Sequence, residues 1–388
     1  MHALRGLLLW CAAVLAVAFA PVAADETVSY EILSKVREGD SVVAVVRQQR
    51  IMFLLYDQTI IGAEFDDEWL RKQAAFPGFA IMQASAYLDR KIAKAAQIGL
   101  GLGTVPTFLR DHGIPTDVVE ISDAVVRQAA NYFLYERCEE DDPEDCDNGE
   151  TFVMDGLAFL NDRTPPRDDK NQEQRYDLFI VDVYTGWNPV LFLVQEVMET
   201  IKAKWLVPSR GVLVMNFVGY HNGPGAAVPR SIRQTLKTVF SHVKVFREVE
   251  DAADEEACNL VFYASDEPFS FNTPTGTYYE NPDPNTYFNV SCQPGPSLSS
   301  STKTEFRLCL EVFNDDDGKS DNAGDSDGPK PQLLTQADHG ESVFASIHVA
   351  TQAHMRERVV ERFPESIWTD LGVKPKKSPS ADDTKDEL

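Results

Sequence analysis

The stretch AQIGLGLGTVPTFLRDHGIPTDVVEISD, Ala96–Asp123, decides the fold of this chain. It predicts a buried strand, a glycine loop, a short helix and a second strand that ends at Glu120. Gly99, Gly101 and Gly103 leave bare backbone that a ligand can approach closely. An acid at the end of the second strand can accept hydrogen bonds from a ribose diol. We therefore expect a nucleotide site at the carboxyl edge of a parallel sheet.

The spacing of the glycine loop distinguishes between nucleotides. A dinucleotide fingerprint requires a third glycine where this chain has Thr104, which is also placed to cap the following helix. The GxGxG spacing, with Glu120 seventeen positions after Gly103, resembles the S-adenosylmethionine (SAM) site of class I methyltransferases. A glycine triplet alone is explained equally well by a tight turn. The strand, helix and acid in register with it favour descent from nucleoside-binding proteins.

Strand and helix patterns alternate along the chain. We expect helices over residues 80–95, 123–135, 157–161, 190–205, 230–242 and 343–363. We expect strands over residues 41–46, 51–56, 59–61, 151–154, 176–181, 211–217, 243–249 and 259–264. This order predicts an α/β protein with a doubly wound sheet that closes in an antiparallel strand pair. Three parts follow a leader: a small N-terminal β-structure (25–79), a nucleotide-binding domain (80–266) and a decorated, partly disordered tail (267–388).

The composition limits the partners. The chain has 388 residues, a formal charge of −25 and 43% hydrophobic residues, which suffice for a large core. Its negative charge argues against nucleic acid and anionic membranes as partners, because both would repel it. Acceptors and ligands of positive charge stay electrostatically possible.

Both ends of the sequence carry targeting signals. Residues 1–24 have Arg5, an apolar run and a small-residue site, so we expect a secretory signal peptide cleaved after Ala24. The chain ends in KDEL, Lys385–Leu388, the motif that the retrieval receptor of the endoplasmic reticulum binds. We therefore expect a protein of the endoplasmic reticulum lumen. Beyond the signal peptide we find no stretch that predicts a membrane span.

The cysteines fit an oxidising compartment. Cys138 and Cys146 flank an acidic loop that a disulfide would hold, and Cys292 and Cys309 could close a hairpin in the tail. Cys258 lies in an expected buried strand and is the candidate free thiol. We expect no metal site, because no CxxC pair or histidine cluster accompanies these residues. Asn289 begins the one usable glycosylation sequon that we find.

Five motifs in order resemble spermidine synthase and its class I methyltransferase-like relatives over roughly residues 41–264. They are IGLGLGT (98–104), VEISD (119–123), MDGLAFL (154–160), YDLFIVDVYTG (176–186) and GVLVMNF (211–217), preceded by RIMFLLYDQTIIG (50–62) in the place of the family's N-terminal β-domain. The resemblance implies a Rossmann-like doubly wound sheet of the class I SAM-dependent methyltransferase type.

The resemblance also implies roles for individual residues. Gly99, Gly101 and Gly103 would line the methionine and ribose part of the cofactor, and Glu120 would hold the ribose hydroxyls. Ile121 would pack near the adenine, and Asp155 and Gly156 would face the adenine amino group. Asp182 would orient and deprotonate an attacking amine. The loop after Asp182 could shape an acceptor pocket with Tyr184, Thr185 and Trp187.

Two departures from the family bear on the activity. Leu102 and Thr185 stand where spermidine synthases have acids, and a multiply charged polyamine needs several carboxylates. We therefore expect a SAM-dependent methyltransferase with an unknown small-molecule or protein acceptor. Two alternatives stay open: an aminopropyltransferase that uses decarboxylated SAM, and a non-catalytic binding module. The family resemblance also leaves a homodimer possible.

Overall fold

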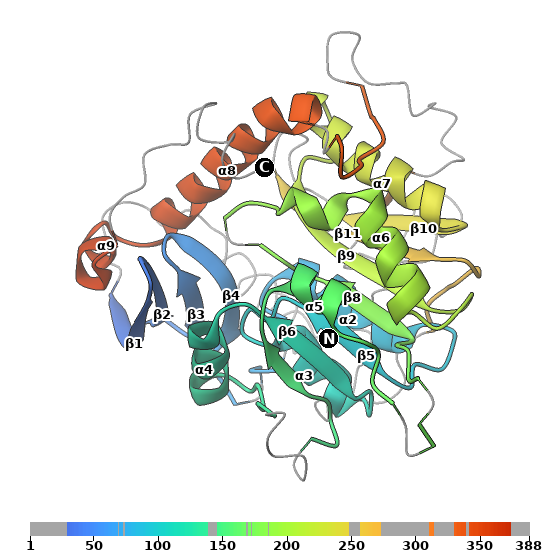
Figure 1. Ribbon diagram of the computed structural model, residues 1–388. Helices are drawn as coiled ribbons and strands as arrows, with labels where there is room; N and C mark the ends of the chain where they lie inside the picture. Colours follow the sequence, from blue (N-terminus) through green and yellow to red (C-terminus); the bar gives the residue numbers. More distant parts are fainter. Residues whose placement is uncertain are drawn as a thin grey trace, which may run out of the picture.

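The computed structural model describes residues 29–68, 70–72, 74–138, 146–167, 170–171, 173–184, 186–247, 257–272, 310–313, 330–338 and 341–373. These residues build a four-stranded sheet next to a larger eight-stranded sheet flanked by helices (Figure 1). The predicted signal peptide, Thr185, Asn289, Cys292, Cys309 and the terminal KDEL lie outside the described residues. Within the part described, no helix is long and apolar enough to span a bilayer.

The smaller sheet is an antiparallel meander of β1 (Tyr30–Glu38), β2 (Ser41–Gln48), β3 (Ile51–Tyr56) and β4 (Thr59–Phe65). We call it the N-terminal sheet. Successive side chains of β2 point to opposite faces of this sheet, and both faces are buried. Val42, Ala44 and Val46 belong to an apolar cluster on one face, and Val43 and Val45 belong to a second cluster on the other face. The second cluster includes residues of α4 (Asp123–Tyr132), so this helix lies between the two sheets.

The larger sheet has the order β12-β10-β11-β9-β8-β5-β6-β7. Its parallel strands are β5 (Ala95–Ile98), β6 (Thr116–Glu120), β7 (Thr151–Val153), β8 (Leu178–Val181) and β9 (Val212–Gly219). The antiparallel strands β11 (Cys258–Ser265), β10 (His242–Arg247) and the short β12 (Leu310–Val312) complete one edge. The predicted α/β class and the closing strand pair are confirmed. From β5 the chain adds β6 and β7 on one side and then β8 and β9 on the other, so the strand order switches between β5 and β8. Ligands bind at such a switch point in folds of this kind.

Helices cover both faces of the larger sheet (Figure 1). One apolar cluster joins α2 (Pro77–Gln83) and α3 (Thr104–Asp111) to the strands. The other joins the opposite face to α5 (Gly156–Asp162), α6 (Gln195–Thr200) and α7 (Ala227–Val239). This three-layer arrangement leaves the carboxyl ends of the parallel strands open to the N-terminal sheet.

Two predicted helices are shorter than expected. The helix predicted for residues 80–95 ends after a 3₁₀ turn, Ala84–Tyr87, because Leu88 is extended and forms a bridge with Phe271. The single helix predicted for residues 190–205 is broken at Val194, whose backbone is extended, into the 3₁₀ turn Val190–Leu193 and α6, which continues as the π-helical turn Ile201–Trp205.

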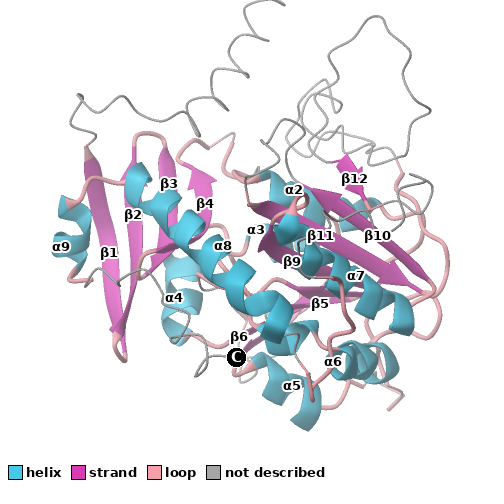
Figure 2. Ribbon diagram, turned by 90° about the horizontal axis from the view of Figure 1, so that it is seen from above, coloured by secondary structure: helices cyan, strands magenta, loops and turns pink. Residues whose placement is uncertain are grey.

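Part of the sequence predicted as a tail packs against both sheets. Leu334 is fully buried beside α6 and α7, and its backbone N–H donates to Thr235 Oγ1 at 3.0 Å. Helix α8 (Glu341–Arg362) then runs from α7 to the N-terminal sheet, and α9 (Ser366–Leu371) covers the outer face of that sheet (Figures 1 and 2). The C-terminal segment therefore bridges the two sheets.

A disulfide joins Cys138 to Cys146 with a Cα–Cα distance of 5.4 Å, and Cys258 is buried in β11. Cys138 lies beside the start of β7, since the Thr151 N–H donates to the Cys138 carbonyl at 2.9 Å. The bond thus holds the connection between α4 and β7.

Candidate functional site

The glycine loop joins β5 to α3 and has left-handed backbone at Gly99, Gly101 and Gly103, with φ of 86°, 56° and 89°. A Cβ on Gly99 would lie 2.0 Å from the Asp182 carbonyl oxygen, and one on Gly101 2.8 Å from the Ile61 carbonyl oxygen. The glycines are thus required by the protein's own close approaches. Gly103 also occupies the N-cap position predicted for Thr104, and Thr104 instead opens α3 without a side-chain cap.

Glu120 ends β6 directly beside this loop. Its Oε2 accepts a hydrogen bond from the Leu100 N–H, and its Oε1 accepts one from the Ser122 N–H, both at 2.9 Å. Burial raises the pKa of Glu120, and the two backbone donors oppose that shift. The carboxylate therefore fixes the loop, and its remaining lone pairs can accept from a ligand hydroxyl.

Ile121 follows Glu120 with 65% of its surface exposed, although it is a large apolar side chain. Val153, at the end of the neighbouring β7, is 39% exposed. Together they present an apolar surface at the carboxyl edge of the sheet, beside the carboxylate of Glu120. A flat apolar ring and a ribose diol would match this combination.

Asp155 and Gly156 have structural tasks in the next connection. Asp155 is exposed and caps α5, because its Oδ1 accepts from the Ala158 N–H at 2.7 Å. A Cβ on Gly156 would lie 2.5 Å from Ile98 Cγ2, so glycine allows α5 to approach β5. The second oxygen of Asp155 stays available for the adenine amino group that the family resemblance implies.

Asp182 follows β8 and forms a polar network that sequence reasoning missed. Asn216 Nδ2 donates to Asp182 Oδ1 at 2.9 Å and to Asn259 Oδ1 at 3.1 Å. Burial raises the pKa of Asp182 to about 6, and the Asn216 hydrogen bond lowers it. Asp182 and Asn216 come from neighbouring parallel strands that are in register, which is the signal that could have revealed the pair.

The loop after Asp182 was predicted to shape an acceptor pocket. Tyr184 and Trp187 are both half-buried, and Thr185 is outside the described residues. Gly186 contacts the N-terminal sheet, since a Cβ there would lie 2.7 Å from Thr59 Oγ1. Asn188, the residue after Trp187, pairs with the Val218 backbone: its Nδ2 donates to the Val218 carbonyl at 2.8 Å, and its Oδ1 accepts from the Val218 N–H at 2.9 Å.

Leu102 stands where spermidine synthases carry an acid. It is buried in the cluster formed by the inner face of the N-terminal sheet and α4, including Val43, Leu54 and Ala124. The side chain is therefore part of the packing between the sheets.

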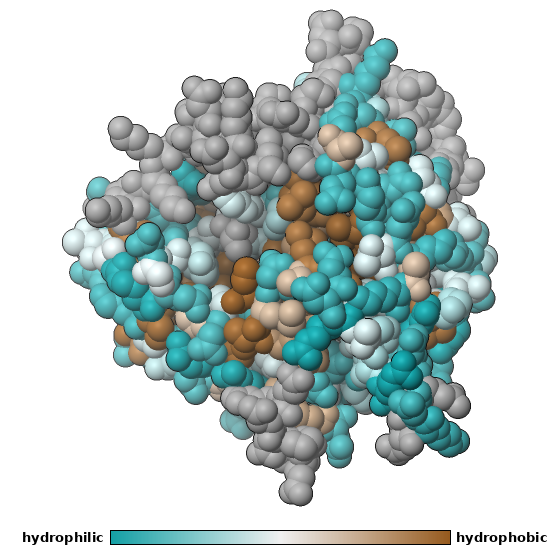
Figure 3. Space-filling view, in the orientation of Figure 1, coloured by the Kyte–Doolittle hydropathy of each residue, from teal (hydrophilic) through white to brown (hydrophobic). Residues whose placement is uncertain are grey.

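Apolar surface gathers near the centre of the face in Figure 3, between the N-terminal sheet and the larger sheet.

Comparisons with solved structures identify this architecture. A probable spermidine synthase from Corynebacterium glutamicum matches with a TM-score of 0.52 and 16% identity over 73% of this chain and 91% of that chain. This chain has the spermidine-synthase-like fold. The fold resemblance predicted from the ordered motifs is thus confirmed. Human methyltransferase-like protein 13 in complex with SAH matches with a TM-score of 0.37 and 21% identity, over 50% of this chain and 80% of that chain.

A curated protein matches more closely in sequence. The N-terminal histidine N-methyltransferase of Emericella nidulans is 33% identical over 190 residues, which are 47% of this chain and 30% of that protein. The chain therefore spans less than a third of the length of this relative. No family model matches the sequence. Within the spermidine-synthase-like fold, the glycine loop, Glu120 and exposed Ile121 fit SAM.

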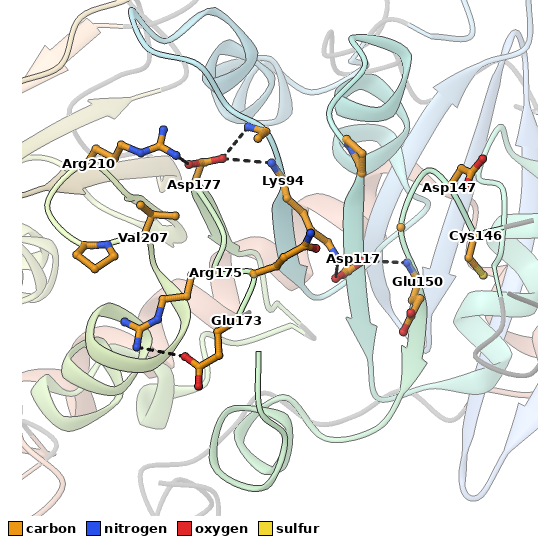
Figure 4. A pocket seen from close by; sticks show the side chains of 15 residues that line it. Lys94, Asp117, Cys146, Asp147, Glu150, Glu173, Arg175, Asp177, Val207 and Arg210 are labelled. Carbon is orange, nitrogen blue, oxygen red and sulfur yellow. Dashed lines mark hydrogen bonds and ion pairs between the residues drawn. The ribbon is translucent and has the colours of Figure 1, made fainter. Parts of the chain in front are cut away.

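A separate cavity of about 760 Å³ lies at the opposite, amino-terminal edge of the parallel sheet. Figure 4 shows its buried acids paired with protein groups: Asp117 with Lys94 at 2.8 Å, and Asp177 with Arg210. Asp117 also accepts from the Tyr176 hydroxyl at 2.7 Å. These ion pairs hold the starts of the strands and are distinct from the predicted site.

Proposed function

We propose that this chain is a SAM-dependent methyltransferase of the endoplasmic reticulum lumen that modifies the N-terminal histidine of secretory proteins. The observation that carries the proposal is the sequence identity with a curated N-terminal histidine N-methyltransferase. The spermidine-synthase-like fold supports it, together with a carboxyl-edge site that fits SAM.

Bound SAM would supply an electrophilic methyl group on a sulfonium. Glu120 would bind the ribose hydroxyls, and Ile121 would pack on the adenine from its exposed position. The backbone of the Gly99–Gly103 loop would line the methionine part. These groups fix the position of the methyl donor, which is the main requirement of an in-line transfer.

The acceptor chemistry fits Asp182. A histidine nitrogen attacks the methyl carbon, the carbon–sulfur bond breaks, and S-adenosylhomocysteine leaves. The methylated nitrogen group must then lose a proton. Asp182, with a pKa of about 6, is mainly a carboxylate at neutral pH and can accept that proton or stabilise the cation. Asn216 holds Asp182 Oδ1 and keeps the carboxylate in place.

Aminopropyl transfer receives less support. Leu102 removes one of the acids that a polyamine site needs, and its side chain is packed between the sheets.

The targeting signals at both ends support a lumenal location, where proteins with newly exposed N-termini are found.

The test is methyl transfer from SAM to synthetic peptides that begin with histidine. We expect a mass gain of one methyl group on the histidine peptide and none on the same peptide beginning with alanine. Asp182→Asn should abolish transfer while the unfolding midpoint stays unchanged. Asp147→Asn is the matched control, because Asp147 is exposed at the opposite edge of the sheet.

Other outcomes identify the alternatives. A product that forms only from decarboxylated SAM and a diamine would support aminopropyl transfer. Absence of binding of SAM and of decarboxylated SAM by the folded protein would support a non-catalytic module.

A further inference from the structure

A carboxylate of the N-terminal sheet lies at the start of α4. Glu38 is the last residue of β1, just before the short turn to β2. Its Oε2 accepts a hydrogen bond from the Ser122 hydroxyl at 2.5 Å, and its Oε1 accepts one from the Ala124 N–H at 3.1 Å. A side chain from one sheet thus satisfies polar groups at the N-terminus of a helix that follows a strand of the other sheet.

Ser122 connects Glu38 to Glu120. Its Oγ also accepts from the Val125 N–H at 3.1 Å, so that Ser122 is the N-cap of α4. Its backbone N–H donates to Glu120 Oε1 at 2.9 Å. Ser122 is 4% exposed and Glu120 is 9% exposed, so water competes little with these bonds. A continuous chain of hydrogen bonds therefore runs from the N-terminal sheet to the acid beside the glycine loop.

The backbone that carries Ile121 is fixed on both sides by these bonds. On one side Glu120 ends β6 and accepts from the Leu100 N–H at 2.9 Å. On the other side Ser122 is held through both its hydroxyl and its backbone N–H. The Ile121 side chain is 65% exposed, so its own packing contributes little to its position. The bonds on each side of it therefore determine where this apolar surface lies.

The rest of α4 is attached to the same strand of the N-terminal sheet. Gln128 Nε2 donates to Ser34 Oγ at 2.9 Å, and the Tyr132 hydroxyl donates to the Leu33 carbonyl at 3.4 Å. Strand β1 and helix α4 are therefore joined from the first turn of the helix to its last. A displacement of β1 would strain the bonds at Ser122, so the placement of the N-terminal sheet affects the carboxyl edge of the larger sheet.

We propose that Glu38 is a positioning residue for the cofactor site, which holds Ser122 and, through it, the carboxylate of Glu120. This inference rests on the proposed function, in which Glu120 binds the ribose hydroxyls of SAM. A carboxylate that is already held in place binds a diol more tightly than one that must be ordered on binding. The N-terminal sheet is then a part of the cofactor site, although its residue acts through another side chain.

The test measures by calorimetry the binding of S-adenosylhomocysteine and of its 2′,3′-dideoxy analogue, which lacks both ribose hydroxyls. The variants are Glu38→Ala and Ser122→Ala. Glu31→Ala is the control, because Glu31 lies on the same strand, is exposed and pairs with Arg47 within the N-terminal sheet. We expect both test variants to weaken binding of S-adenosylhomocysteine by about five- to tenfold, the lower part of the usual range for coupling between sites.

The dideoxy analogue distinguishes positioning from a general structural role. It cannot donate a ribose hydroxyl to Glu120, so its affinity should be the same in the wild type and in both test variants. The control should leave the affinity of both ligands unchanged. Ser122→Ala also removes the N-cap of α4, so each affinity is measured well below the unfolding midpoint of the variant.

The readouts separate this inference from the proposed function. If the test variants weaken both ligands equally, or weaken neither, the positioning role is wrong, and methyl transfer to the histidine-led peptide decides the function independently. If the loss is confined to S-adenosylhomocysteine but the wild type transfers no methyl group to the peptide, the positioning role stands and the proposed function fails. If the folded wild type binds neither ligand, both are overturned.

Discussion

Leu102 fills the space above Gly62: a Cβ built on Gly62 would lie 2.6 Å from Leu102 Cδ2. Leu102 of the glycine loop therefore packs against the N-terminal sheet at a position where Gly62 has no side chain. Gly62→Ala should destabilise the protein by about 1–3 kcal/mol through overpacking. Leu102→Ala should cost about 2–5 kcal/mol by leaving a cavity. The double variant should cost less than the sum, because the smaller residue at 102 relieves the clash. Urea unfolding measures all three, and strict additivity would contradict this packing.

Ile121 should contribute to cofactor binding and little to stability. It is 65% exposed, so Ile121→Ala should leave the free energy of unfolding within about 0.5 kcal/mol of the wild type. The same change should weaken SAM binding by about tenfold, since a partly buried apolar contact of about 1.5 kcal/mol is lost. Calorimetric titration checks the affinity, with Leu191→Ala as control because Leu191 is also an exposed apolar residue, at 37%. Equal affinities for both variants would remove Ile121 from the site.

The hydrogen bond from Asn216 should set the pH range of activity. The free-enzyme pKa of Asp182 is about 6, so kcat/KM should rise as pH increases through that value. Asn216→Leu removes a hydrogen-bond donor that stabilises the Asp182 carboxylate, and this raises the pKa of Asp182. The rising limb of the plot of kcat/KM against pH should therefore move to higher pH. The limb should stay in place in Asn161→Leu, since Asn161 is exposed on α5. An unmoved limb in Asn216→Leu would show that another group controls the profile.

Glu64 should make the folded protein less stable as pH rises from about 4.5 to about 7. Its carboxyl is buried on β4 beside Arg71, and burial raises its pKa from 4.5 to about 7 despite that ion pair. The native state thus holds a proton that the unfolded state releases in this range. At higher pH the folded state carries the full cost of the buried charge, on the order of 3 kcal/mol.

Glu64→Gln isolates this effect because other buried acids titrate in the same range. The difference in unfolding free energy between wild type and variant should change across this pH window and stay constant outside it. Chemical denaturation at a series of pH values measures the difference. A constant difference throughout would show that Glu64 keeps an ordinary pKa when folded.

The Cys138–Cys146 disulfide should stabilise the connection to β7. It closes a loop with a sequence separation of 8, for which loop-closure entropy predicts about 2–3 kcal/mol. The double variant Cys138→Ser with Cys146→Ser should therefore unfold at a lower temperature than the oxidised wild type. A reductant should lower the wild-type midpoint to that of the variant and leave the variant unchanged. A wild-type midpoint that does not respond to reductant would contradict this contribution.

The sequence predicted the β5–α3–β6 unit well because its signals are local. Glycines, a strand pattern on each side and a terminal acid all lie within 28 residues, Ala96–Asp123. The closing pair β10 and β11 was similarly predictable from two neighbouring apolar runs. By contrast, the break at Val194 depends on tertiary packing, because the apolar pattern of residues 190–205 continues on both sides of it.

The polar part of the site was less predictable for a related reason. Asp182 stood out as an acid after a buried strand, but its partner Asn216 lies 34 residues later in an otherwise apolar strand. Only the strand register places the two side chains together.

The covering of the N-terminal sheet by α9 also constrains how the chain folds during synthesis. Val42, Ala44 and Phe53 are made early, whereas Ile367, Trp368 and Leu371, which complete their apolar cluster, are made more than 300 residues later. Until that last segment emerges, the nascent protein must carry an uncovered apolar sheet face, which is a surface prone to aggregation and suited to chaperones. The apolar face of the N-terminal sheet is therefore covered only after more than 300 further residues have been synthesised.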